Sequence, residues 1–375
     1  MKNRRMKNIK PECARTGRSG LRPFIRHSRM RRHLWGLCLG LLLLGTSCTA
    51  NEAEQGEVVN VYNWGEYIDK DLLTKFQEET GIRVIYSNFT TNEDLYVKLK
   101  SGGSNYDVVV PSDYMIERMR NEGMLRKINW ENVPNMRYVD AAYKNHSYDP
   151  EQEYSAPFFW GTLGIVYNTT MVEEPVDSWS ILWNEKYARE IIMMDSSRDS
   201  LGITLRWKGH SMNSTDSAQL AEAKELLTRQ YPLVYAYLVD QTKDIMRNGE
   251  AALAVMYSGD ALDALLENED LAYAIPKEGS NLWFDAMVIP KNAQHPKNAE
   301  AFINFMLDPE NAAQNAAYVG YSLPNSQARA LLPEEYRDSE VAYPPEERLK
   351  NLEVFRDPGK WVRQYDEIWQ EVKNQ

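Results

Sequence analysis

The order of apolar segments in residues 58–111 constrains this chain most strongly. A β-branched run at 58–62 is followed by a helical pattern at 69–80 and an extended segment at 82–86. A second helical pattern, which Asn92 can cap, precedes an apolar strand at 106–111. A continuous apolar strand is typical of a parallel sheet buried on both faces. The β-α-β-α-β order therefore predicts an α/β layer with crossover connections.

The same alternation occurs a second time farther along the chain. Its expected elements are strands at 191–194, 251–256 and 273–275, a helix around 218–230, and a helix after Gly259. Helical patterns at 296–318 and 351–375 complete the chain. With 375 residues, of which 43% are hydrophobic, the chain is long enough to build two such lobes.

The first 47 residues are typical of an export signal. They carry 12 Lys and Arg against one acid, and the apolar segment at 34–44 is shorter than the about 20 residues that span a bilayer. Met30 would give a signal peptide of ordinary length, so we expect translation to start there. Cys48 resembles the acylated cysteine of a bacterial lipoprotein, although Gly45 stands where that pattern usually has Leu. Residues 48–57 are then a short polar tether.

Charge and cysteine content exclude several functions. Residues 48–375 hold 31 basic and 53 acidic residues, and the net charge of −22 disfavours binding to nucleic acid and to anionic membranes. Cys48 is the only cysteine that remains after signal removal, so neither an intramolecular disulfide nor a Cys-rich zinc site can form. The remaining histidines lie far apart at His146, His210 and His295. We therefore expect no metal, no cofactor and no catalytic centre.

Aromatic residues follow the ends of several expected strands, where an open α/β sheet places its ligand crevice. They lie in residues 62–67, 111–114, 256–260, 283–285 and 320–325. Taken singly, each aromatic residue is better explained by core packing. Three of the segments, however, combine an aromatic residue with a carboxylate within three residues. That recurrence favours a binding site.

These segments, in this order, resemble the spermidine/putrescine-binding proteins of bacterial ABC transporters over nearly all of residues 58–375. The most specific pieces are Tyr62-Asn63-Trp64 with Glu66-Tyr67, the run from Tyr106 to Ser112, residues 275–279, Trp283-Phe284-Asp285 and Gly320-Tyr321. The resemblance implies an α/β periplasmic-binding-protein fold, in which two lobes joined by crossing strands close on a polyamine in the cleft between them.

The resemblance also implies where the chain passes from lobe to lobe. The expected crossings lie near residues 159–162, near Asp285 and near residue 330. One lobe would then comprise residues 58–161 and 285–329. The other lobe would comprise residues 162–284 and 330–375.

The binding residues of the family fall on matching positions of this chain. The implied aromatic cage is Trp64, Tyr67, Tyr114, Tyr257, Trp283 and Tyr321, where Tyr257 replaces a usual Trp. The implied polar contacts are Ser112, Asp199, Asp260, Asp285 and Gln370, with Asp285 matching the carboxylate that grips an ammonium group. Ser196 and Asp199 replace an Asp and a Glu of spermidine-preferring members, while Asp260 matches an aspartate of putrescine-preferring members. The choice between the two amines stays open.

The resemblance implies an extracytoplasmic solute-binding protein, not an enzyme, that captures putrescine or spermidine for an ABC transporter permease. It would be a periplasmic or cell-surface monomer that touches the membrane only through a lipid anchor at Cys48. The residues agree, because aromatic walls suit methylene groups and carboxylates suit ammonium groups. One alternative is a secreted carbohydrate-active enzyme, and another is the same fold binding a different small cation or acid as a sensor partner. Asp260 and Asp285 could instead be helix caps or turn residues.

Overall fold

The structure is a computed structural model that describes residues 56–102 and 105–375. The expected signal peptide 1–47, its start at Met30, the acylation site Cys48 and most of the tether lie outside the described residues. The strands are β1 (Val58–Trp64), β2 (Arg83–Phe89), β3 (Val108–Val109), β4 (Ser155–Asn168), β5 (Ile191–Met194), β6 (Val234–Leu238), β7 (Leu253–Tyr257), β8 (Leu271–Ala274) and β9 (Leu282–Val288).

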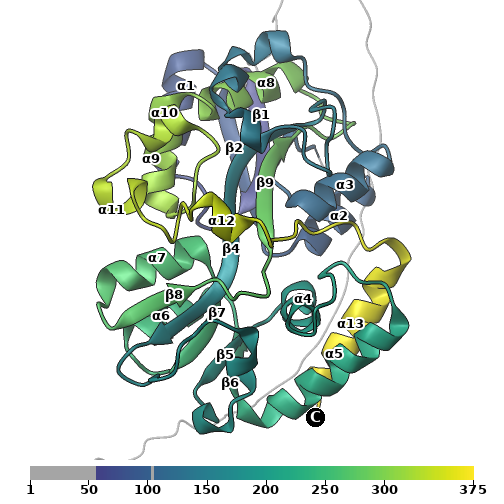
Figure 1. Cartoon of the computed structure of the whole chain (residues 1–375). Helices are drawn as coiled ribbons and strands as arrows, with labels where there is room; N and C mark the ends of the chain where they lie inside the picture. The colour runs from purple at the N-terminus through teal and green to yellow at the C-terminus, as the bar shows by residue number, and fades with distance from the viewer. Residues whose placement is uncertain (1–55, 103–104) are drawn as a thin grey trace, which may run out of the picture. The chain divides into compact units, whose positions relative to one another are not determined.

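Thirteen α-helices lie between and after these strands within the described part of the chain (Figure 1). They are α1 (Lys70–Thr80), α2 (Asn92–Lys100), α3 (Asp113–Asn121), α4 (Ser197–Trp207), α5 (Ser217–Gln230), α6 (Thr242–Arg247), α7 (Ser258–Glu267), α8 (Pro296–Met306), α9 (Pro309–Val319), α10 (Ser326–Arg329), α11 (Glu334–Arg337), α12 (Glu346–Leu349) and α13 (Val362–Lys373).

The strands form one sheet with two parallel portions. Its order is β2-β1-β3-β9-β4-β7-β5-β6, and β8 pairs with β4 beside this path. β1 pairs in parallel with β2 and β3, and β5 pairs in parallel with β6 and β7. The pairs that β4 and β9 make are antiparallel. The prediction of an α/β fold with two rounds of strands and helices is confirmed.

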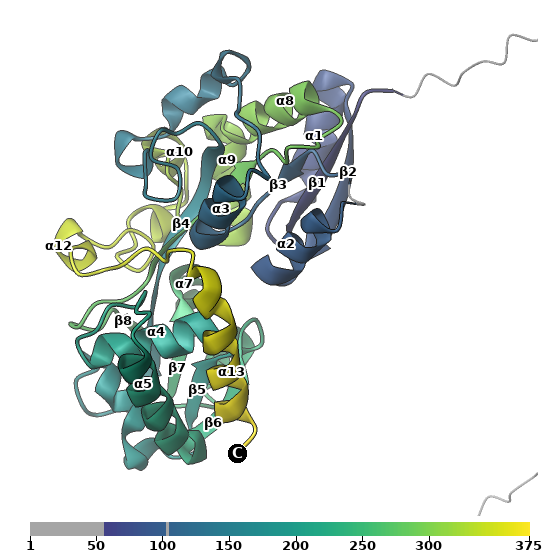
Figure 2. The same cartoon turned by 90° about the vertical axis from the view of Figure 1, so that its right-hand side faces the viewer.

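The long strand β4 belongs to both portions of the sheet. Its residues from Ser155 to Thr162 pair with β9, and its residues from Leu163 to Tyr167 pair with β7. Figures 1 and 2 show β4 running from the elements around β1 to those around β7. The change of partner falls at the end of the expected first crossing at 159–162, so this strand fixes the two portions relative to each other.

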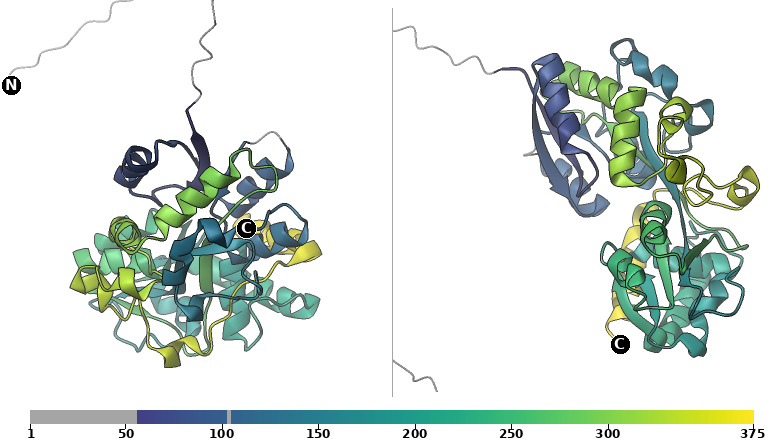
Figure 3. Two further views of the ribbon diagram at one scale, coloured as in Figure 1. Left: turned by 90° about the horizontal axis from the view of Figure 1, so that it is seen from above. Right: turned by 90° about the vertical axis from the view of Figure 1, so that its left-hand side faces the viewer.

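The chain passes between the two cores for the last time in the segment that follows residue 330. Leu332, just past the expected crossing near residue 330, is buried in the core that contains Val59 and Phe302. Phe355 is buried in the other large core, together with Trp369. The chain therefore passes from one core to the other between Leu332 and Phe355. It ends at α13, which Figure 2 shows beside the elements around β5, and the right-hand view of Figure 3 shows the C-terminus at the same end of the molecule. The exact lobe boundaries stay a prediction.

Local chemistry explains where several helices begin and end. Asp69 caps α1 by accepting a hydrogen bond from the backbone N–H of Asp71, and Gly81 ends the helix at φ 72°. The cap of α2 is Thr91 and not the expected Asn92, because the Asn92 side chain bonds instead to Ser112. The expected helix at 296–318 is two helices, because Pro309 cannot donate the backbone hydrogen bond that would continue α8.

Candidate ligand-binding site

Strand β9 positions two of the expected binding residues. Trp283 and Asp285 are two residues apart, so their side chains lie on the same face of the strand. Both side chains are buried. Trp283 is paired with Gly161 of β4, where a Cβ atom would lie only 2.6 Å from Cζ2 of the indole ring. Gly161 therefore provides the space that the Trp283 ring occupies.

Asp285 is a buried carboxylate with one oxygen bound and one open. Its Oδ2 accepts a hydrogen bond from the Tyr67 hydroxyl at 2.6 Å, and its backbone bridges to Ser112. Asn92 in turn holds Ser112, since its Oδ1 accepts the Ser112 backbone N–H at 3.0 Å. Asp285 Oδ1 has no hydrogen-bond partner among the described residues. Burial raises the pKa of Asp285 to about 6, although hydrogen bonding to Tyr67 and Ser112 offsets part of the rise.

Two tyrosine rings pack against Trp283, and a third joins them through Tyr321. The ring centroids of Tyr257 and Tyr321 lie 5.8 and 5.1 Å from that of Trp283, both in edge-to-face geometry. Tyr67 lies 5.6 Å from Tyr321, so the rings form one connected group. Edge-to-face packing of this kind holds each ring in a defined orientation.

Two further carboxylates are bonded to this group. The Tyr321 hydroxyl donates to Asp260 Oδ2 at 2.8 Å, and the Tyr257 hydroxyl donates to Asp199 Oδ2 at 3.0 Å. Asp199 is only 4% exposed, and its Oδ1 has no partner in the part of the chain that the structure describes. Burial raises the pKa of both carboxyl groups.

Direct contacts thus join eight of the expected binding residues, which we call the aromatic–carboxylate cluster. Its members are Tyr67, Ser112, Asp199, Tyr257, Asp260, Trp283, Asp285 and Tyr321. They come from β9, from the loops after β1 and α9, and from the N-terminal ends of α3, α4 and α7. Segments far apart in the sequence therefore meet at one place.

The remaining expected residues lie at the margin of the cluster or outside it. Trp64 packs against the core cluster that includes Trp283, and its ring contacts Phe89 at 4.5 Å. The Tyr114 hydroxyl donates to Glu93 at 3.1 Å. Gln370 is exposed on α13, and no contact joins it to the aromatic–carboxylate cluster within the described residues.

Two cations beside the cluster were not anticipated from the sequence. Arg198 on α4 is 7% exposed and lies over the Tyr114 ring at 5.5 Å. Lys243 on α6 forms an ion pair with Asp263 and lies 3.9 Å from Asp260. Arg198 directly precedes the expected binding residue Asp199, which is a weak signal. Nothing in the sequence signals Lys243, because its position depends on how α6 packs against α7.

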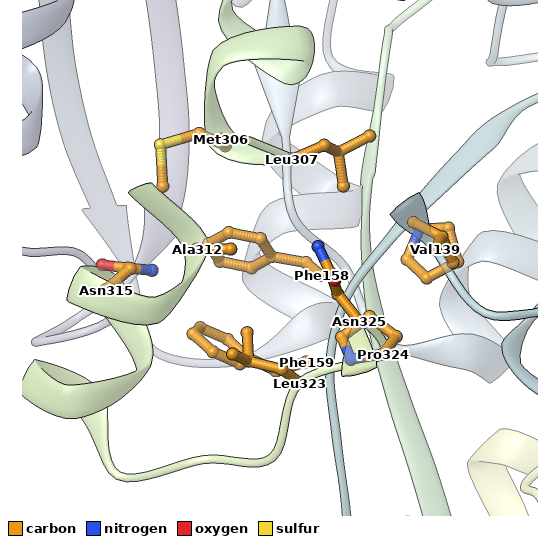
Figure 4. Close-up of a pocket in the computed structure, with 11 residues that line it drawn as sticks. Val139, Phe158, Phe159, Met306, Leu307, Ala312, Asn315, Leu323, Pro324 and Asn325 are labelled. Atoms are coloured by element: carbon orange, nitrogen blue, oxygen red, sulfur yellow. The ribbon is translucent and has the colours of Figure 1, made fainter. Parts of the chain in front are cut away.

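A small cavity lies beside Phe159, as Figure 4 shows. Its volume is about 10 Å³, and Phe158, Phe159 and Leu323 are among the residues that line it. The Phe159 ring also contacts Tyr67 at 5.2 Å. The cavity is about the size of one water molecule, and no member of the aromatic–carboxylate cluster lines it. It is therefore too small, and lined by the wrong residues, to be the site of a polyamine.

Two kinds of feature are absent from residues 56–102 and 105–375. No group of three or more His, Cys, Asp or Glu side chains could hold a metal ion there. No helix in these ranges is both long and apolar enough to cross a bilayer.

Comparisons with known proteins assign the chain to a family. Residues 71–342 match the family of the bacterial extracellular solute-binding protein. The spermidine/putrescine-binding periplasmic protein of Escherichia coli K12 is 37% identical over 344 residues, which cover 91% of this chain and 98% of the relative. An ABC transporter structure from Listeria monocytogenes is 45% identical with a TM-score of 0.81, covering 84% of this chain and 99% of that one. The Tp0655 (TpPotD) lipoprotein of Treponema pallidum is 28% identical with a TM-score of 0.77, covering 85% and 100%. The chain belongs to the bacterial extracellular solute-binding proteins.

Proposed function

We propose that this protein captures a polyamine, putrescine or spermidine, outside the cytoplasm and delivers it to the permease of an ABC transporter. The name of the Escherichia coli relative, which spans almost the same length, supports this ligand class. Capture needs no covalent chemistry, so the protein acts as a binder and not as an enzyme.

The open carboxylate oxygens of the aromatic–carboxylate cluster carry the proposal. Asp199 Oδ1 and Asp285 Oδ1 are buried and have no hydrogen-bond partner in the described parts of the chain. A buried carboxylate oxygen without a partner is costly, and an ammonium group can supply both the charge and the hydrogen bond that it lacks. The neighbouring Trp283 offers an apolar face for methylene groups and a cation–π partner for the charge. A flexible aliphatic dication carries both the ammonium groups and the methylene groups that these side chains can bind.

We infer that the ligand also joins the two lobes. Asp199 lies on α4, whose Leu201 is buried in one large core, whereas Asp285 lies on β9, whose Met287 is buried in the other. As a proposal, we keep lobes of residues 58–161 with 285–329 and of residues 162–284 with the chain from Phe355 onward, because Leu332 is buried in the core of the first lobe. A ligand that bridges the two carboxylates favours the closed arrangement, because both contacts form only when the lobes meet.

A thermal-shift screen of the mature chain tests the ligand class directly. We expect putrescine or spermidine to raise the melting temperature, because a ligand at about 100 times its dissociation constant adds about 2.7 kcal/mol of stability. Amino acids and neutral sugars serve as controls and should leave the melting temperature unchanged. Stabilisation by a sugar or an acid, without any by amines, would reject the proposal.

The raised pKa of Asp285 predicts how polyamine affinity depends on pH. An ammonium group binds the ionised carboxylate, so affinity should fall as the pH drops through about 6, approaching tenfold per pH unit at the acidic end. Ligand amines, with a pKa of about 10.4, stay protonated throughout this range. Titration calorimetry between about pH 5 and pH 8 measures the effect. A constant affinity over this range would contradict the role of Asp285.

The stability of the unliganded protein should depend on pH in the opposite direction. The folded-state pKa of Asp285 lies above the ordinary value of 3.8, so the folded state binds more protons than the unfolded state between these values. The contribution of Asp285 to the free energy of unfolding therefore decreases as the pH rises through about 6.

We further propose that Cys48 is acylated and that the monomeric protein touches the membrane only through this anchor. The lipoprotein from Treponema pallidum supports an anchored form. The mass of the mature N-terminal peptide tests the proposal, since a lipid-free Cys48 or an intact signal peptide would contradict it.

A further inference from the structure

Two side-chain cations of the protein itself border the aromatic–carboxylate cluster. The Lys243 ammonium lies 2.9 Å from Asp263 Oδ2 and 3.9 Å from Asp260 Oδ1. On the other side, the Arg198 guanidinium is held over the Tyr114 ring. Asp260 and Tyr114, two of the expected ligand contacts, are therefore already engaged by cations of the chain.

The number of open acceptors follows from the contacts of four buried or half-buried carboxylates. Asp260 is occupied on both sides, by the Tyr321 hydroxyl at Oδ2 and by Lys243 near Oδ1. Asp113 is also occupied, because its two oxygens accept the backbone N–H groups of Tyr114 and Phe284. Only Asp199 and Asp285 keep a buried oxygen that lacks a partner in the described structure.

We propose that Lys243 is a resident cation that limits the ligand to two ammonium groups, so that the cluster prefers a linear diamine over a triamine. This inference rests on the proposed function. Asp199 and Asp285 each accept one ammonium group of a diamine. A third ammonium group would be desolvated without a buried carboxylate of its own, beside either Lys243 or Arg198.

The exposed acids near the cluster do not replace a buried acceptor. Glu66 and Glu93 are both exposed, and ion pairs in water contribute little because solvent screens them. The Lys243–Asp260 pair is better protected, since only 28% of the Lys243 side chain and 31% of the Asp260 side chain are exposed. Lys243 therefore acts on the site more strongly than a surface charge would.

Titration calorimetry with 1,4-diaminobutane and spermidine tests the inference. The wild type should bind the diamine about tenfold more tightly than the triamine. Lys243→Gln removes the charge and returns Asp260 Oδ1 to the ligand, so spermidine affinity should rise about fivefold while diamine affinity changes by less than about twofold. Lys243→Arg keeps the charge and should retain the preference of the wild type.

Lys277→Gln is the matched control, because Lys277 is exposed and pairs only with the exposed Asp177 in the described structure. It makes the same change of net charge away from the cluster and should leave the amine ratio unchanged. If the wild type binds spermidine more tightly than the diamine, the inference is overturned. This result does not depend on whether the variants fold. The inference is also overturned if Lys243→Gln and Lys277→Gln give the same amine ratio. If neither amine binds the wild type, the proposed function itself fails, which is a different result.

Discussion

Asp285→Asn is expected to weaken polyamine binding at least about tenfold while the chain still folds. A charge-assisted hydrogen bond contributes about 1.5–3 kcal/mol, and the amide keeps the shape of the side chain but not its charge. The Tyr67 hydroxyl, now 2.6 Å from Asp285 Oδ2, can still donate to the amide oxygen. Titration calorimetry with putrescine and spermidine measures the loss.

Asp177→Asn is the control for this variant. Asp177 is exposed and pairs with Lys277 at 3.3 Å, so the control makes the same change of net charge away from the site. Asp285→Asn should also raise the stability of the unliganded protein above about pH 6, because it removes a buried charge whose pKa is raised. Equal polyamine affinities of the two variants would reject Asp285 as a ligand contact.

Gly259→Ala is expected to lower polyamine affinity by at least about tenfold, because close-packed interiors leave no room for an added methyl group. A Cβ atom at Gly259 would lie 1.9 Å from Cδ1 and 2.2 Å from Cε1 of Tyr321. The Tyr321 ring would have to move, which breaks its hydrogen bond to Asp260 and its edge contact with Trp283. The same calorimetric titration measures the effect.

Two further variants test why Gly259→Ala loses polyamine affinity. Gly56→Ala adds the same methyl group where no atom of the described residues, apart from the chain neighbours, lies within 4 Å, and it should bind polyamine like the wild type. Tyr321→Phe removes only the hydroxyl that donates to Asp260, so it should lose less affinity than Gly259→Ala. Unchanged affinity in Gly259→Ala would show that the position of the Tyr321 ring does not matter for binding.

Much of the fold was predictable because each element carries its own signal. The apolar run Ile191–Met194 is β5, and the helical pattern around residues 218–230 is α5. Gly81 ends α1 where the sequence pattern predicts the end, since only glycine adopts that backbone conformation without strain. In these segments local periodicity and burial agree.

Features that depend on tertiary packing were not predictable in the same way. Asn92 carries a capping side chain, but the fold brings Ser112 within its reach and Thr91 becomes the cap. The place of the last crossing likewise depends on which core buries each residue after Leu332, and that is a property of the fold and not of local periodicity.

The candidate site also contains residues that the sequence could predict and residues that it could not. A resemblance carried along the sequence named the eight residues that the structure brings together, of which Trp283 and Asp285 lie within β9 and the others lie near the ends of strands and helices. Lys243 was missed because no local sequence pattern distinguishes it from the other lysines of the chain. Lys243 lies beside the site only because the fold places α6 next to Asp260 and Asp263 of α7.

The sharing of β4 between the two portions of the sheet has a consequence for how the protein unfolds. One half of β4 pairs with β9, and the other half pairs with β7. Loss of the hydrogen bonds to one of these strands therefore weakens the pairing with the other. Heat or denaturant should thus melt both halves together, as one cooperative unit, although their hydrophobic interiors are separate.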